Sequence, residues 1–345
     1  MKIRKLLLPL FLIIFLILTR AFWYPPLRLG WELTKYIASE VMNESEVSEE
    51  SVEELPLIEP KEQTFSIANV ELGMTRSEVE AMHGDPQRES QNEYNVTWTT
   101  YHENYHNFFM VAYDNNNNVH GLYTNQELIS SKNDLALGSP QTSVLDKLGS
   151  PLTSIRKGLV NYLIQDNGEF HVFSIDNTFL TVFYDLHEEK RVTAIQIISE
   201  ELELAHNELY TPASSDLTEG FKWQLYDLTN ATRYKHNLSI LSWSEIAAAT
   251  GLKHSQDMAE NNYFDHNNLA GESPFDRMNQ DQISYRLAAE NLAYGQTSSI
   301  FAHQGLLNSE GHRKNILHPD FELLGIGVSF NQEDQPYFTE LFYQE

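Results

Sequence analysis

The stretch that decides the fold is "GLLNSEGHRKNIL", Gly305 to Leu317, near the end of a 345-residue chain. It places Glu310, His312, Arg313 and Asn315 within six residues. Such a density of polar side chains predicts either a reactive site or a turn that needs these groups for its own hydrogen bonds. The choice between them depends on which other parts of the chain can reach His312.

Further motifs flank this stretch. Ser242 to Glu245, "SWSE", has capping-box spacing ahead of an apolar-periodic segment and predicts a helix that ends near Asn262. The last two apolar segments flank the polar turn "NQEDQ" and predict a terminal hairpin. The motifs, in chain order around the opening stretch, are "LKHSQDMAENNYFDHNN" (252–268), "AAENLAYG" (288–295), "LLGIGVSF" (323–330) and "YFTELF" (337–342).

This ordered set resembles the bacterial form of the CAP domain, the cysteine-rich secretory, antigen 5 and pathogenesis-related superfamily, over about Leu225 to Glu345. The resemblance implies an α-β-α sandwich, the CAP fold, which we place at residues 217–345. The chain contains no cysteine, so nothing that depends on the disulfides of eukaryotic members carries over.

The resemblance also implies a central cleft lined by two His and two Glu. His266 closes the "YFDH" motif, Glu290 belongs to "AEN", and His312 belongs to "GHR". Glu310 is the fourth candidate, at a position where many bacterial members have Pro. Asn291, Arg313 and Asn315 are expected to hold the backbone around these motifs, and His303 is expected to be exposed.

Two imidazoles with one or two carboxylates can do three things. His266 and His312 can bind a divalent metal such as zinc, with the carboxylates either as further ligands or as hydrogen-bond partners of the histidine ligands. The same groups can exchange protons in acid–base chemistry, or they can form a hydrogen-bond network that only shapes the cleft. The nearby hydroxyls that could serve as nucleophiles are those of Ser273 and Ser309, and Ser309 is expected to start a turn or cap a helix instead.

The resemblance and the missing nucleophile favour an extracytoplasmic binding or interaction protein over an enzyme, with a cleft able to hold a divalent metal or a small ligand. A metal-dependent or acid–base hydrolase at the cell envelope stays open as an alternative. A third alternative is that a protein partner binds the repeat region described next.

The middle of the chain contains an internal repeat. "LGMTRSEVEAMHGDP", Leu72 to Pro86, aligns with "LGSPQTSVLDKLGSP", Leu137 to Pro151, and each copy predicts a short helix followed by a hairpin. We therefore expect a tandem-repeat α+β domain at residues 64–205. It resembles the domain that precedes CAP domains in some Gram-positive bacterial proteins.

The N-terminus predicts contact with a membrane. Three basic residues precede the apolar run from Leu6 to Leu18, which makes residues 1–24 a hydrophobic helix that serves as a signal peptide or a membrane anchor. Residues 25–63 form a predicted acidic linker. The formal charge of −26 argues against nucleic acid as a partner and leaves an unknown protein or small molecule. The whole chain is thus expected to be an α+β protein, membrane-anchored or secreted.

Overall fold

The computed structural model describes residues 55–345, and this part of the chain has an α+β fold. The predicted signal peptide or anchor and residues 25–54 of the acidic linker lie outside the described residues. Within residues 55–345, none of the helices combines the length and the apolar character that a membrane crossing requires.

The first half is built on a seven-stranded antiparallel sheet with strand order β2-β3-β4-β5-β11-β10-β9. The strands are β2 (Arg88–Gln91), β3 (Thr97–Glu103), β4 (His106–Tyr113), β5 (Val119–Thr124), β9 (Phe170–Ile175), β10 (Thr178–Asp185) and β11 (Arg191–Ser199). Two short pairs accompany it, β1 (Phe65–Ile67) with β6 (Ile129–Ser131), and β7 (Ser154–Lys157) with β8 (Val160–Leu163). The helices are α3 (Arg76–His83), α4 (Gln141–Leu148) and α5 (Glu200–Ala205).

Local sequence explains the two helices of the predicted repeat. Thr75 and Glu78 form a reciprocal capping box at the start of α3, and Gly84 ends this helix with a φ of 76°. The corresponding Gly149, φ 81°, ends α4, whose N-cap position is occupied by Pro140 and has no side-chain cap. Because β5 pairs with β11, the strands that follow the two helices build one continuous sheet.

The second half has the predicted α-β-α arrangement around a four-stranded sheet of order β12-β14-β15-β13. The strands β12 and β14 are parallel, and the other neighbours are antiparallel. The strands are β12 (Ser242–Trp243), β13 (Leu287–Tyr294), β14 (Leu323–Phe330) and β15 (Pro336–Gln344). The helices are α6 (Ser215–Lys235), α7 (Glu245–Asn261), α8 (Pro274–Gln280), α9 (Ser299–Asn308) and α10 (Glu310–Ile316).

The alternation of β14 shows why helices cover both faces of this sheet. Leu324, Ile326 and Val328 point into a buried cluster with apolar residues of α6 and α9. Gly325 and Gly327 point to the opposite face, where α7 lies so close that a Cβ at position 327 would come within 2.0 Å of a backbone nitrogen of that helix. Large residues on one face and glycines on the other thus set two different helix-to-sheet distances.

The start of α7 corrects one prediction. Ser242 is not the cap, because Ser242 and Trp243 form β12 beside β14. Ser244 is the N-cap, and its side chain accepts a hydrogen bond from the backbone N–H of Ala247. The predicted C-terminal end near Asn262 is correct, because Asn262 adopts the left-handed conformation there, with a φ of 52°.

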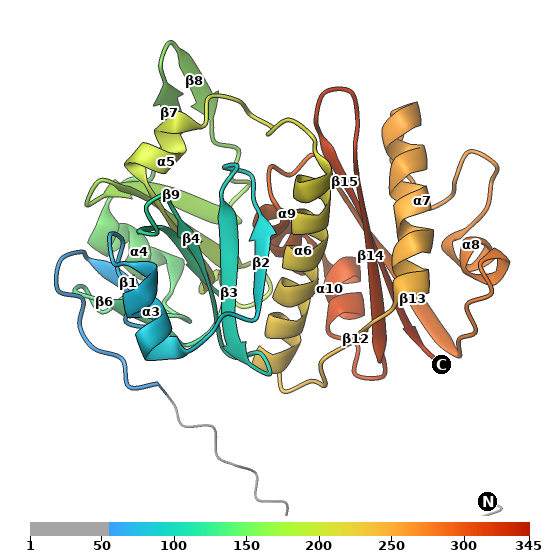
Figure 1. Ribbon diagram of the computed structural model, residues 1–345, viewed down its shortest axis with the longest axis horizontal. Coiled ribbons are helices and arrows are strands. Elements are labelled where there is room, and N and C mark those ends of the chain that lie inside the picture. Colours follow the sequence, from blue (N-terminus) through green and yellow to red (C-terminus); the bar gives the residue numbers. More distant parts are fainter. Residues whose placement is uncertain (1–54) are drawn as a thin grey trace, which may run out of the picture. The chain divides into compact units, whose positions relative to one another are not determined.

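The two halves share a core. Helix α6 lies between the seven-stranded and the four-stranded sheets (Figure 1), and one buried cluster joins Trp98 and Phe108 of the first half to Leu228 and Ile300 of the second. Residues 54–345 accordingly form one compact unit. The burial of a side chain near this interface therefore depends on the packing of both domains.

Candidate functional site

Three of the four predicted cleft residues come from different elements of the C-terminal domain. His266 lies in the loop between α7 and α8, Glu290 lies in β13, and His312 lies in α10. The strand position explains the burial of Glu290, whose side chain is 2% exposed, whereas the loop leaves the His266 side chain 52% exposed. The site therefore has a buried carboxylate beneath an accessible imidazole.

Glu290 holds two partners at once. His266 Nδ1 lies 2.8 Å from Glu290 Oε1, and Arg277 Nη2 donates to Glu290 Oε2 at 2.6 Å. Arg277 also donates through Nη1 to the backbone carbonyls of His266, at 2.8 Å, and Glu272, at 3.0 Å. The arginine thus fixes both the carboxylate and the loop that carries His266. Because Nδ1 of His266 is occupied, its Nε2 is the nitrogen left for a ligand.

The two histidines are perturbed in opposite directions. The hydrogen bond to Glu290 raises the pKa of His266, and burial of the ring only partly opposes this. Burial lowers the pKa of His312, and the charge of His266 lowers it further. The two opposite shifts separate the titrations of the pair, so that a proton is held more readily by His266 than by His312.

A polar network anchors α10 beneath the cleft. Asn291 Nδ2 donates to the His312 carbonyl at 3.2 Å and to Glu340 Oε2 at 3.0 Å, while Asn315 Nδ2 donates to Asn291 Oδ1 at 2.9 Å. Glu340 is fully buried and also accepts from the Thr229 hydroxyl. Burial raises the pKa of Glu340 to about 7. Asn291 thus holds the backbone of α10, and Asn315 orients the Asn291 amide and donates to the Glu290 carbonyl at 3.4 Å.

Glu310 does not share the contacts of the other three. It is the first residue of α10, its side chain is 74% exposed, and it pairs with Lys314 at 2.6 Å one turn along the helix. Arg313 donates to the Leu307 carbonyl of its own turn at 3.5 Å. It also forms an ion pair with Asp185 of β10, at 2.8 Å, and so joins the two domains.

Two serine hydroxyls lie near the motifs of the cleft. Ser273 forms a capping box with Asp276 at the start of α8, so its hydroxyl is committed. Ser309 occupies the N-cap of α10 without a side-chain cap bond.

Sequence reasoning missed Arg277 and Glu340. The only signal was a charged residue in the "FDRM" helix and one acidic residue within the apolar "YFTELF" strand.

The donor set fits a tightly held resident metal poorly. Within residues 55–345, no three His, Asp or Glu side chains converge as a metal site. Both oxygens of Glu290 already accept hydrogen bonds, Oε1 from His266 and Oε2 from Arg277, so this carboxylate is placed to orient His266 behind a bound cation. The arrangement suits at most a cation held by the imidazoles of His266 and His312, with its other positions left to water or a ligand.

Two family models match the chain. The model described as CAP-associated N-terminal matches residues 72–209, and the model of the cysteine-rich secretory protein family matches residues 226–342. The first match covers the seven-stranded sheet, and the second covers all four strands of the C-terminal sheet together with its cleft.

Two curated proteins of Bacillus subtilis (strain 168) are similar to about a third of this chain. The uncharacterized membrane protein YlbC is 42% identical over 119 residues, which are 34% of this chain and 33% of YlbC. The uncharacterized protein YkwD is 40% identical over 117 residues, 34% of this chain and 46% of YkwD. The chain therefore spans between a third and a half of the length of these relatives.

Two solved structures share the fold over most of the described chain. An extracellular protein with an SCP domain from Bacillus anthracis has a TM-score of 0.70 at 24% identity, covering 85% of this chain and 99% of that one. A cysteine-rich secretory protein from Staphylococcus aureus has a TM-score of 0.63 at 15% identity, covering 83% and 98%. The two family models thus show that this chain carries a CAP-associated N-terminal domain at residues 72–209 followed by a CAP domain of the cysteine-rich secretory protein family at residues 226–342.

Proposed function

We propose that this chain is an extracytoplasmic binding protein whose CAP cleft holds a small ligand or a divalent cation through His266 and His312. The basic and apolar N-terminus, the membrane-protein relative YlbC and the extracellular Bacillus anthracis neighbour support this location. The single observation that carries the binding proposal is the His266–Glu290–Arg277 arrangement. It presents an oriented, accessible imidazole over a buried carboxylate.

The roles of the residues follow from their contacts. Glu290 fixes the ring of His266 through Nδ1 and stabilises its protonated form. Arg277 keeps Glu290 in place and holds the His266 backbone. His312 contributes a neutral ring that can accept a proton or a metal. Ligand binding needs no further group, whereas hydrolysis by acyl transfer needs a nucleophile, and the hydroxyl of Ser273 is already engaged in a cap.

Zinc titration tests the metal part of the proposal. The full-length chain, stripped of metal and kept in mild detergent, is titrated with zinc by calorimetry, alongside the single variants His266→Ala and His312→Ala. We expect binding in the parent protein and its loss in both variants. The variant His318→Ala is the matched control, because this ring packs against Phe321 at the end of α10. Absence of zinc binding in the parent protein would remove the cation from the proposal and leave the small ligand.

A second candidate function has one specific observation in its favour, the opposite pKa shifts of His266 and His312. They are what an acid–base hydrolase of the cell envelope would need. The test is incubation with peptidoglycan and with peptide libraries. Release of products that disappears in Glu290→Gln supports hydrolysis, and absence of release from the parent protein eliminates it. Binding of a protein partner through the N-terminal domain stays a prediction.

A further inference from the structure

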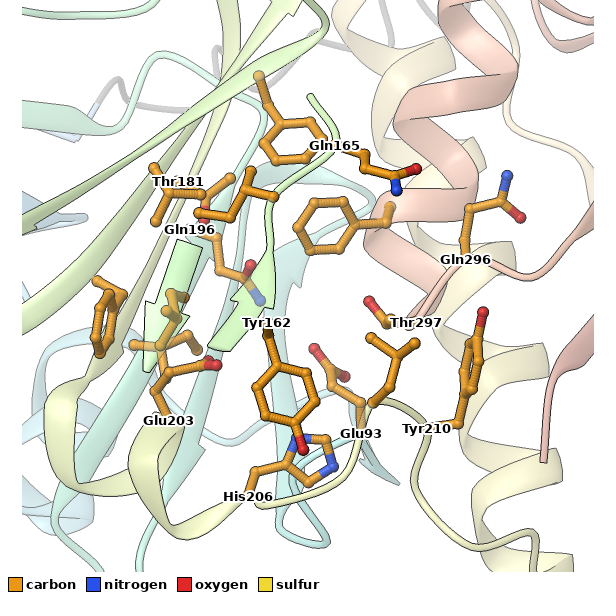
Figure 2. A pocket seen from close by; sticks show the side chains of 18 of the residues that line it. Glu93, Tyr162, Gln165, Thr181, Gln196, Glu203, His206, Tyr210, Gln296 and Thr297 are labelled. Carbon is orange, nitrogen blue, oxygen red and sulfur yellow. The ribbon is translucent and has the colours of Figure 1, made fainter. Parts of the chain in front are cut away.

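A second site lies between the two domains, away from the CAP cleft. A cavity of about 540 Å³, open on one side, is walled by the seven-stranded sheet, the β7–β8 hairpin and the segment after α5, and on the CAP side by α9 and the loop after β13. Figure 2 shows this hollow, with Gln196 and Glu203 on one side and Gln296 and Thr297 across from them. The volume is in the range of pockets that enclose small organic ligands.

The cavity contains a buried carboxylate without a counter-ion. Glu93 is 5% exposed, and its Oε2 has no hydrogen-bond partner among the described residues. Burial, reinforced by the charge of Glu203, raises the pKa of Glu93 to about 7, although its own backbone and the polar groups of Gln196 and Trp98 act in the opposite direction. Because an unpaired buried carboxylate is costly, a cation at this position would stabilise it.

The charges already present in the cavity do not provide that cation. Lys157 is the one Lys or Arg among the described residues that line it, and it pairs with Glu203 at 2.6 Å with both side chains nearly buried. The Tyr94 hydroxyl also donates to Glu203, at 2.6 Å. Burial and the charge of Lys157 lower the pKa of His206, so this ring is neutral above its ordinary pKa. Glu93 thus faces the cavity with a local excess of negative charge.

The rest of the wall suits an apolar body with a polar edge. Phe170 and Phe301 contact each other edge-to-face with ring centroids 5.1 Å apart, one from each domain. Gln296 Oε1 is a buried polar atom without a partner among the described residues, and Gln296 belongs to the lining. The Gln196 amide acts on Glu93, whose pKa it lowers. A ligand in this cavity would therefore meet two aromatic rings and one free acceptor as well as Glu93.

We propose that the interdomain cavity binds an organic ammonium ion, a primary amine with an apolar body, whose charge pairs with Glu93 and whose body packs against Phe170 and Phe301. This site is independent of the proposed function of the CAP cleft. The amine can come from a free small molecule or from the N-terminus of a peptide. Both sources offer the same chemistry, and the open side of the cavity admits either.

The test is a titration of the full-length chain with 2-phenylethylamine and with its neutral match 2-phenylethanol, followed by nuclear magnetic resonance. We expect the amine to bind at least about tenfold more tightly, the size of a charge-assisted hydrogen bond. The dipeptide amide Phe-Ala-NH₂ is the peptide arm. Tighter binding of the dipeptide assigns the site to peptide N-termini, and tighter binding of the free amine assigns it to small molecules. Equal binding of amine and alcohol, or no binding of either amine, overturns the proposal.

Variants locate the binding. Glu93→Gln should abolish the preference for the amine, while Glu208→Gln, the same charge change at the exposed rim of the cavity, should preserve most of it. Lys157→Met provides an independent check if Glu93→Gln fails to fold. The substitution removes the counter-ion of Glu203 and makes the cavity more negative, so it should tighten amine binding. An unchanged preference in Glu93→Gln, or weaker amine binding in a folded Lys157→Met, refutes the assignment.

The pH dependence follows from the same carboxylate. Between about pH 6 and about pH 8 the alkyl ammonium of 2-phenylethylamine keeps its proton while Glu93 loses its own, so the affinity for 2-phenylethylamine should rise with pH across the Glu93 pKa of about 7. The groups that act on Glu93 are Glu203 with its partners Lys157 and Tyr94, and the neutral His206 lies on the same wall. An affinity that is constant over this range, or the same slope in Glu93→Gln, contradicts the role of Glu93.

Discussion

The contact between α6 and the edge strand β2 makes a quantitative prediction for Gly220→Ala. A Cβ at position 220 would lie 2.0 Å from the carbonyl oxygen of Gln91 and 2.9 Å from its carbonyl carbon. Both are backbone atoms, so no side-chain rotation relieves the overlap. The helix and the strand must separate, and this separation opens the core shared by the two domains.

The magnitude follows from three contributions. Overpacking against rigid backbone costs about 3 kcal/mol, at the upper end of its usual range. Separation also weakens the hydrogen bond of 2.8 Å from Gln224 Nε2 to the Gln91 carbonyl, which is worth about 1 kcal/mol. Replacing glycine by alanine in a helix recovers about 1 kcal/mol. The lost hydrogen bond and the gain from alanine cancel, so we expect Gly220→Ala to lose about 3 kcal/mol of unfolding free energy through overpacking.

The assay is urea unfolding of the full-length chain, followed by far-ultraviolet circular dichroism and tryptophan fluorescence. The matched control is Gly311→Ala in α10, where a new Cβ has no neighbour within 4 Å and the backbone needs no positive φ. The control should keep or slightly gain stability. If Gly220→Ala unfolds at the same urea concentration as Gly311→Ala, the close approach of α6 and β2 is wrong.

Three other changes probe the cleft and its supports. Arg277→Met should cost about 3 kcal/mol of unfolding free energy, because it leaves Glu290 buried without its arginine, and urea unfolding measures this. Glu290→Gln should lower the pKa of His266, because the hydrogen bond to the Glu290 carboxylate is the main cause of its upward shift. A titration of the His266 ring by nuclear magnetic resonance measures this, and an unchanged pKa in the variant would contradict the contact between His266 and Glu290. The raised pKa of Glu340, about 7 against an ordinary 4.5, means that the folded state binds the extra proton. Stability should therefore fall by roughly 3 kcal/mol as the pH rises from about 4.5 to about 7, and Glu340→Gln should remove this part of the slope.

Local patterns in the sequence predicted the elements that carry the site. The end of α7 near Asn262 and the apolar segments of β14 and β15 depend on neighbouring residues, so they can be read along the chain. The C-terminal sandwich was predicted through the resemblance of an ordered set of motifs. Ser242 shows the limit of this reading, because two serines could cap α7 and only the pairing of β12 with β14 decides between them.

Contacts between distant residues were beyond the sequence. His303 was expected to be exposed, yet it is fully buried at the domain interface, where its Nε2 lies 2.7 Å from the Thr232 hydroxyl. Arg88 pairs with the buried Asp227, which is 139 residues away along the chain. Nothing in the local pattern of α9 or β2 indicates these partners, because the surface of one domain becomes core only when the other packs on it.

The sequence by itself determined which residues can do chemistry here: His266, Glu290 and His312 stand in motifs that can be read without a structure. The tertiary structure decided how they are used. It brought Arg277 to the second oxygen of Glu290, directed Glu310 to solvent beside Lys314, and left Glu93 without a counter-ion in a cavity between two domains. The physical reason is the same in each case. Burial and charge pairing depend on the distance between side chains in space, and that distance follows from how the sheets and helices pack.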